Sequence, residues 1–197
     1  MCEVPVFYAT NEGQTRRIAE RIADQIRKHG LDSRAVPIIS EEASHIDWTR
    51  ARGVALGASL HMQRHQAEAA AFARVHHQAL SAIPSLFFSI SLAAASTRVG
   101  EVDAARRLAE RFTTEAGWTP SRVASVAGRL AYTQYNWFVR FFMRHIAAKE
   151  GGSLDTTRDH EYTNWEQVEW LADELAYEVR RREIFPKDEP VTLRPAS

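Results

Sequence analysis

Six residues near the start of the chain, Thr10 to Thr15, combine the side chains and the glycine that can hold a phosphate group. They read Thr-Asn-Glu-Gly-Gln-Thr, follow a short apolar run at 4–8 and precede an amphipathic helical pattern. The first N–H groups of a helix have no partner within it, and the helix dipole adds roughly half a positive charge there. The segment therefore predicts an anion cradle, although an ordinary strand-to-helix turn capped by a threonine fits the same residues.

Within this segment the hydroxyl groups are candidate donors, and the glycine lets the backbone approach a phosphate closely. The turn holds no lysine and the chain has no G-x-G-x-x-G pattern, so two common nucleotide-binding loops are excluded. Glu12 is awkward beside a phosphate, and we expect it to point outward or to receive backbone donors at the helix start. The residues predicted to contact the phosphate are Thr10, Asn11, Gly13, Gln14 and Thr15.

The composition excludes several classes of protein. A length of 197 residues suits one α/β domain with a buried core, and a net charge of zero gives no reason to expect nucleic acid as a partner. A single cysteine excludes a disulfide framework and a cysteine-ligated cluster, and it fits a reducing compartment. No signal-peptide pattern opens the chain, and no apolar run approaches the ~20 residues of a membrane span. We expect a cytoplasmic protein, or one peripheral at the inner face of the plasma membrane.

Apolar runs alternate with helical periodicity along the chain, which predicts an α/β fold with a parallel sheet. Thr163 and Glu166 match the S/T-x-x-E capping box, so the last helix is expected to begin at Thr163. The expected architecture is a doubly wound five-stranded sheet of order 2-1-3-4-5. The predicted strands are 4–8, 31–39, 53–58, 85–91 and 123–127, and the predicted helices are 14–29, 66–80, 101–117 and the one from 163.

Ligands of such a sheet bind beyond the carboxyl ends of the strands, at the switch point between the first and third strands. The turns 9–15, 58–65 and 91–98 should meet there. His61 and His65 have a spacing that can bind zinc on a helix, but no third ligand is close in the sequence. We therefore predict no metal site.

The region between Gly128 and Tyr162 exceeds a minimal five-stranded fold. It is rich in aromatic residues, and two of its arginines lie four positions apart. Long insertions in compact domains are usually functional or disordered, and this one is too aromatic for disorder. We expect one domain over 1–183, with the insertion at about 129–161 and a disordered tail at 184–197.

The chain resembles the flavodoxin-like, quinone-dependent protoporphyrinogen IX oxidases of bacteria up to about residue 180. Its Thr10–Thr15 segment is similar to the FMN phosphate loop of flavodoxins, with Glu12 where a serine or threonine is typical. An acidic residue at that position is tolerated in this family. The other matching segments are Gly57-Ala58-Ser59, Pro84-Ser85, Ala127–Tyr132, the insertion aromatics, Gly151-Gly152 with Asp155-Thr156, and Tyr162–Val168.

This resemblance implies non-covalent FMN and the oxidation of protoporphyrinogen IX in haem synthesis, with a membrane quinone as acceptor. The fold topology then places Ser59, Leu60, His61, Ser91, Leu92 and Ala93 at the border of the isoalloxazine ring or the ribityl chain. The insertion would offer an apolar face for the macrocycle and cations for its propionates, and it could rest against an anionic bilayer. The residues expected to bind substrate are Arg129, Tyr132, Tyr135, Trp137, Arg140 and Arg144, and no catalytic base is assigned.

Three other functions stay open at this point. A flavodoxin-type electron carrier is the first, but carriers usually steer their partners with a charged face and this chain is neutral. A general NAD(P)H:quinone reductase would need a nicotinamide site that the sequence does not show. The third is a flavodoxin-like module that has lost its flavin and binds a partner through the aromatic insertion.

Overall fold

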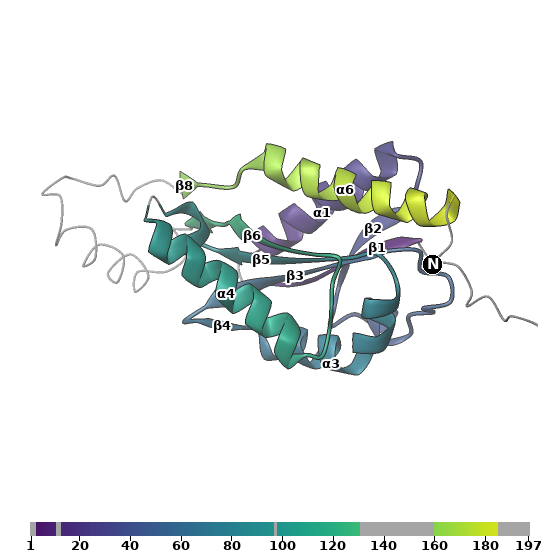
Figure 1. The fold of residues 1–197 in the computed structure, drawn as a ribbon, viewed down its shortest axis with the longest axis horizontal. Coiled ribbons are helices and arrows are strands. Elements are labelled where there is room, and N and C mark those ends of the chain that lie inside the picture. Colours follow the sequence, from purple (N-terminus) through teal and green to yellow (C-terminus); the bar gives the residue numbers. More distant parts are fainter. Residues whose placement is uncertain (1–2, 11–12, 97, 131–159, 185–197) are drawn as a thin grey trace, which may run out of the picture.

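Five parallel strands form the central sheet of the computed structural model, which describes residues 3–10, 13–96, 98–130 and 160–184 (Figure 1). Their order is β2-β1-β3-β5-β6, so the predicted 2-1-3-4-5 arrangement of a doubly wound sheet is confirmed. The strands are β1 (Val4–Ala9), β2 (Ser33–Pro37), β3 (Val54–His61), β5 (Ser85–Ser91) and β6 (Arg122–Ala127).

A sixth, two-residue strand was not predicted. It is β4 (Arg64–His65), which pairs antiparallel with the last residues of β3. This pairing extends β3 to His61, three residues beyond the strand end that the sequence predicted. The carboxyl end of β3 is therefore one arm of a tight hairpin.

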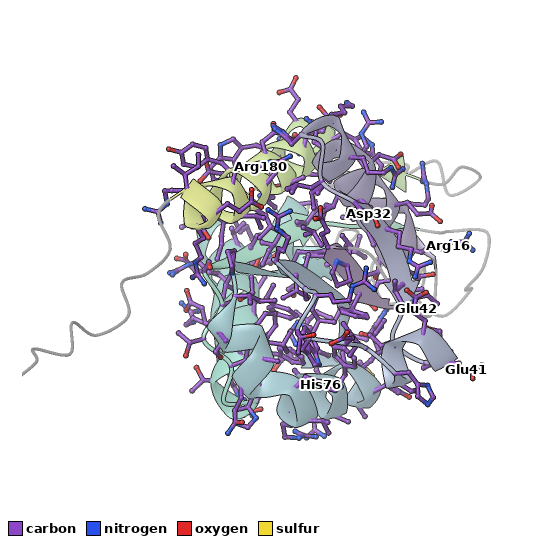
Figure 2. All side chains as sticks on the ribbon, turned by 90° about the vertical axis from the view of Figure 1, so that its right-hand side faces the viewer. Arg16, Asp32, Glu41, Glu42, His76 and Arg180 are labelled. Carbon is purple, nitrogen blue, oxygen red and sulfur yellow. The ribbon has the colours of Figure 1, made fainter. Side chains whose placement is uncertain are left out.

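Helices cover both faces of the sheet (Figure 1). The helices α1 (Gln14–Lys28) and α6 (Trp165–Ile184) pack on one face, and α3 (Ala67–Ala82) and α4 (Val99–Glu115) pack on the other. Figure 2 shows the two layers from the side, with Arg180 of α6 and His76 of α3 on opposite sides of the sheet. Two shorter elements are α2 (Glu41–Ser44) and the 3-10 helix η1 (Ala93–Ala95).

The two cores follow from the alternation of side chains along the strands. All seven residues of β5 are buried, as expected for a strand with helices on both of its faces. Phe88 joins the core under α1 and α6, whereas Phe87 points to the other core and stacks on Phe112 of α4 at a centroid distance of 4.5 Å. Trp118 closes that second core, and its indole N–H donates to the Leu80 carbonyl at 3.2 Å.

The two ends of the long segment before the last helix lie side by side. They form a small antiparallel sheet of β7 (Arg129–Leu130) and β8 (His160–Glu161), and the Tyr162 N–H donates to the Gly128 carbonyl at 3.2 Å. This sheet follows directly on the carboxyl end of β6. The residues between, 131–159, and the tail 185–197 lie outside the described residues.

The predicted start of the last helix is wrong. The helix begins at Trp165, and its cap is Asn164, whose side-chain oxygen accepts from the Gln167 N–H at 3.0 Å. Thr163 is used differently, because its hydroxyl donates to the Ala127 carbonyl at 2.9 Å and accepts from the Gln14 side chain at 2.8 Å. Asn164 is as good a cap as threonine, so tertiary bonding decides which of the two is used.

Gly57 is the tightest point of the central sheet. A Cβ at this position would lie 2.2 Å from two ring carbons of Phe88, a separation that real Cβ atoms essentially never show. Because the ring is fully buried, Gly57→Ala is expected to lower the free energy of unfolding by about 2 kcal/mol. Urea denaturation measures this change.

Gly100→Ala in α4 is the matched control, since a Cβ there meets nothing within 4 Å. It should leave stability unchanged or raise it by up to ~1 kcal/mol. Equal effects of the two substitutions would contradict the packing argument.

Candidate cofactor site

Three loops begin side by side at the carboxyl edge of the sheet. Ala9 of β1 pairs with Ala58 of β3, and Ser59 of β3 pairs with Ile90 of β5. Because the three strands are parallel, the turns that follow them leave the sheet at the same edge, as expected at a switch point. The described residues of the turns 9–15, 58–65 and 91–98 thus lie around one location.

The amino end of α1 is open at this location. Gly13 is its N-cap, and no described side chain caps it. The same holds for α3 and α4, whereas Ser40 and Asn164 cap α2 and α6 with their own oxygens. Thr10 contributes indirectly, because its hydroxyl oxygen accepts from the Gly13 N–H at 2.9 Å. The first amides of α1 are therefore available to an anion without competition from a described side chain, while Asn11 and Glu12 lie outside the described residues.

Gly13 is needed for its backbone conformation. Its φ of +84° lies in the left-handed region, where a Cβ costs roughly 1–2 kcal/mol. A Cβ here would meet nothing within 4 Å. No described residue leaves too little space for a Cβ, so the left-handed backbone is the structural reason for a glycine here. The close approach of the backbone to a phosphate, which the sequence predicts, would be a second reason.

Thr15 carries the clearest sign of a missing ligand. Its side chain is 1 % exposed, and its hydroxyl has no hydrogen-bond partner among the described residues. A buried hydroxyl without a partner costs about 1–3 kcal/mol, so native proteins rarely keep one without reason. Thr15 stands in the first turn of α1, and its hydroxyl fits a phosphate oxygen held by the adjacent amides.

Gln14 uses its side chain to tie α1 to the chain before α6. The amide nitrogen donates to the Thr163 hydroxyl at 2.8 Å, and the amide oxygen accepts from Arg17 at 3.3 Å. A contact from Gln14 to a phosphate would accordingly come from its backbone N–H. The Thr163 hydroxyl in turn binds Ala127, so one residue joins the phosphate loop to the end of β6.

The β3–β4 hairpin forms the second wall of the site. Its two turn residues, Met62 and Gln63, have φ of 47° and 64°, the left-handed pair that a type I′ turn requires. Neither is the glycine or asparagine that adopts this conformation at low cost, so the turn is strained. The hairpin is held from inside by His65, whose Nε2 is hydrogen-bonded to the Ser89 hydroxyl at 2.8 Å.

Gln66 is a site residue that the sequence analysis missed. Its amide nitrogen donates to the Ser59 hydroxyl and, at 3.5 Å, to the Ala9 carbonyl, so it bridges the carboxyl ends of β3 and β1. Its amide oxygen is buried without a partner among the described residues. The Ser59 hydroxyl is also hydrogen-bonded to His61 at 3.2 Å. A lone glutamine at a helix start gives no sequence signal for such a role.

The third wall is the turn after β5. The buried Ser91 accepts from the Ala94 N–H at 3.2 Å and thereby shapes η1, and its carbonyl accepts from the Gly128 N–H at 3.1 Å. Leu92 and Ala93 are half-buried at this edge. The polar groups of the three walls fit a phosphorylated cofactor such as FMN. The ring contacts predicted for Leu60, Leu92 and Ala93 stay predictions.

The predicted substrate residues are mostly outside the described part of the chain. Arg129 is placed by its backbone in β7, next to the carboxyl end of β6, and nothing is described of its side chain. The other five, Tyr132, Tyr135, Trp137, Arg140 and Arg144, fall within 131–159.

No group of three His, Cys, Asp or Glu side chains that could hold a metal occurs among the described residues. None of the described helices combines the length and the apolar composition that a bilayer crossing requires.

Comparison with known proteins agrees with this geometry. A family model described as a flavodoxin domain matches residues 5–157. The protoporphyrinogen IX dehydrogenase (quinone) of Escherichia coli K12 is 30% identical over 172 residues, which cover 87% of this chain and 93% of that protein. The enzyme of the same name from Leishmania major is 32% identical over 174 residues, which cover 87% of this chain and 73% of that protein.

A solved structure supports the fold. A short-chain flavodoxin associated with a bacterial microcompartment covers 91% of this chain and 99% of its own, with a TM-score of 0.53 and 14% identity. At that identity the likeness concerns the arrangement of the backbone alone.

Thr15→Val is predicted to change stability and cofactor affinity in opposite directions. In protein stripped of FMN, the substitution removes a buried, unpaired hydroxyl and should raise the free energy of unfolding by about 1 kcal/mol. The same loss removes a phosphate contact and should weaken FMN binding about tenfold. Urea unfolding and titration of FMN fluorescence measure the two quantities.

Thr113→Val is the matched control, because this hydroxyl is also buried but donates to the Glu110 carbonyl at 2.9 Å. It should lower stability and leave FMN affinity unchanged. If Thr15→Val destabilises the FMN-free protein as Thr113→Val does, the hydroxyl has a partner and the argument for a ligand there is wrong.

His65 makes stability depend on pH. Burial lowers the pKa of His65 from 6.5 to about 4, as its ring packs against Phe87 and Phe112. Between these values the unfolded chain binds a proton that the folded chain does not, so stability falls as the pH drops from 6.5 towards 4. The full loss is about 3 kcal/mol.

His65→Gln keeps a hydrogen-bonding group for Ser89 and cannot titrate, so it should flatten this part of the pH profile. Burial also lowers the pKa of His76, and the difference between wild type and variant isolates His65. His45→Gln, at an exposed imidazole, is the control. Parallel profiles of wild type and His65→Gln between pH 4 and 6.5 in urea unfolding would refute the assignment.

Proposed function

This chain belongs to the flavodoxin-domain family of the quinone-dependent protoporphyrinogen IX dehydrogenases, and on that premise we propose that it oxidises protoporphyrinogen IX to protoporphyrin IX with a membrane quinone as electron acceptor. The chain is accordingly an oxidoreductase, and FMN is its cofactor. The geometric observation that carries the proposal is the buried Thr15 hydroxyl, which has no partner among the described residues and stands at the start of α1, where no described side chain forms a cap.

The residues of the three walls would hold FMN in the following way. The amides at the start of α1 and the Thr15 hydroxyl bind the phosphate, with Gly13 setting the direction of the backbone. Ser59 and Gln66 offer polar groups between the ends of β1 and β3. When bound, FMN supplies the acceptance and release of electrons, and the protein supplies position and electrostatics.

The substrate would approach from the side of β7 and β8. The family substrate combines an apolar macrocycle with two propionates, and the segment between these strands offers aromatic side chains for the first and arginines for the second. Guanidinium groups bind carboxylates bidentately, which suits Arg129, Arg140 and Arg144. Tyr132, Tyr135 and Trp137 are the proposed aromatic contacts.

A quinone acceptor implies contact with a bilayer. We propose that the protein works at the inner face of the plasma membrane, with the aromatic and basic segment 131–159 against the lipid. The proposed functional domain is 1–183.

Anaerobic mixing with protoporphyrinogen tests the reaction directly. Loss of flavin absorption near ~450 nm, followed by its return on addition of quinone, is the expected result. A flavin spectrum that protoporphyrinogen leaves unchanged would contradict the proposal and favour an electron carrier.

The double variant Arg140→Glu/Arg144→Glu tests the substrate residues. It should keep FMN and raise the KM for protoporphyrinogen at least about tenfold, because carboxylates would then face the propionates. Arg107→Glu/Arg111→Glu is the matched control, with two exposed arginines four positions apart on α4. Equal turnover of both double variants and wild type would remove these arginines from the substrate site.

A further inference from the structure

The outward face of α6 carries three large apolar side chains seven residues apart. Trp170, Tyr177 and Ile184 are 48%, 65% and 69% exposed. Seven residues are nearly two helical turns, so the three side chains form one stripe with a spacing of about 10 Å. The α6 helix lies in the outer layer of the fold, and its opposite face packs on α1 and the sheet (Figure 1).

Two charged side chains flank this stripe without a partner. Glu166 near its start and Arg181 near its end form no ion pair or hydrogen bond with any other described side chain. The acidic residues at the middle of the stripe are different. Asp173 is bound by α1, and Glu174 is paired with Arg122 at 3.0 Å. Glu178, half-buried beside Tyr177, also has no such partner among the described residues, so it is the exposed unpaired charges of this helix, Glu166 and Arg181, that sit at the two ends with opposite signs.

We propose that the part of this stripe around Trp170 and Tyr177 is the interface of a homodimer, in which α6 packs antiparallel against α6 of a second copy about a two-fold axis, with Ile184 beyond the edge of the contact. The axis passes between positions 173 and 174. Trp170 then faces Tyr177 of the second copy, and Glu166 faces Arg181 of the second copy. Each of these contacts occurs twice, as a two-fold interface requires.

The unpaired charges at the ends of the stripe favour the antiparallel arrangement. Asp173 and Glu174, which meet across the axis, are each bound by groups of their own chain. A parallel pair would place Glu166 against Glu166 and Arg181 against Arg181, and like charges across an interface are repulsive. Arg122 restricts the orientation of Trp170 before the two copies meet, because its guanidinium lies 4.7 Å from the centroid of the Trp170 ring.

A bilayer is a poorer occupant of this face than a second copy. The helix carries twice as many acidic as basic side chains, and its exposed aromatic residues stand between carboxylates. Such a surface is repelled by anionic lipids. A second copy offers the complementary pattern, because the same stripe presents its basic end to the acidic start of the other.

The dimer leaves the cofactor site free. The helix starts at the carboxyl edge of the sheet, where Thr163 contacts Gln14, and the stripe runs away from that edge. Antiparallel packing places the two sites at opposite ends of the assembly. The inference therefore does not depend on the proposed reaction, and its test needs no activity measurement.

Sedimentation velocity of the full-length, FMN-loaded protein tests the proposal from about 1 to about 200 µM. One helix pair of about 30 Å buries less than a standard interface, so dissociation in the micromolar range is expected. Arg181→Glu and Glu166→Arg should each raise the dissociation constant at least about tenfold, because each reversal creates two repulsive contacts. The double variant Glu166→Arg/Arg181→Glu restores both pairs and should dimerise like the wild type.

Recovery by the double variant is the decisive result. The two positions lie 15 residues apart on one helix and do not meet within a chain, so only contact between copies explains it. Circular dichroism must show an intact helix in each variant, and Val75→Glu on α3, at a side chain 74% exposed, should not alter the dimer. A monomer at all concentrations, or single reversals without effect or without rescue, would overturn the proposal. So would loss of binding to anionic vesicles by Trp170→Ala in a protein that stays monomeric.

Discussion

Parallel pairing of β1, β3 and β5 is the constraint from which the site follows. Once these strands are parallel neighbours, their carboxyl ends lie at one edge of the sheet. The three turns that follow the strands therefore begin next to one another. Of the three buried side-chain atoms without a partner in the described part of the chain, that of Thr15 lies in the first of these turns and that of Gln66 directly follows the second, whereas that of Ser125 lies in β6. The fold thus places the Thr15 hydroxyl and the Gln66 amide oxygen, which have no partner among the described residues, where a polar ligand would bind.

Single side chains join the walls of the site to one another. The Thr163 hydroxyl connects Gln14 of α1 with Ala127 of β6, and Gln66 connects the ends of β1 and β3. His65 fixes the hairpin to β5 through Ser89. A change in one wall is therefore transmitted to its neighbour by a short, directional contact. Such cross-links let a site be positioned by loops while the sheet supplies the rigidity.

The regular part of this architecture was predictable because it depends on patterns that the backbone period imposes. Ile18, Ile22 and Ile26 repeat every four residues and are all buried on α1, and the apolar run 85–91 is a strand buried throughout. The parts that escaped prediction depend on contacts between distant residues. The start of α6 is set by the bonds of Thr163, and the β3–β4 hairpin has Met and Gln where an Asn-Gly pair would have signalled the turn.

The same distinction holds within the site. The hydroxyl and glycine positions of the Thr10–Thr15 segment follow from local chemistry, and the sequence predicts them as phosphate contacts. Gln66 gains its role only because folding brings Ala9 and Ser59 together, which no local pattern encodes.

The small sheet of β7 and β8 has a consequence for how this protein can diversify. Because Arg129–Leu130 and His160–Glu161 are hydrogen-bonded to each other, the points where the chain leaves and re-enters the core are fixed side by side. The entropy of closing a flexible segment between two fixed points rises only with the logarithm of its length, by about 0.6 kcal/mol for each doubling. A change in the length or sequence of the chain between these two points therefore costs little entropy, and selection can act on it while the sheet and its helices stay as they are.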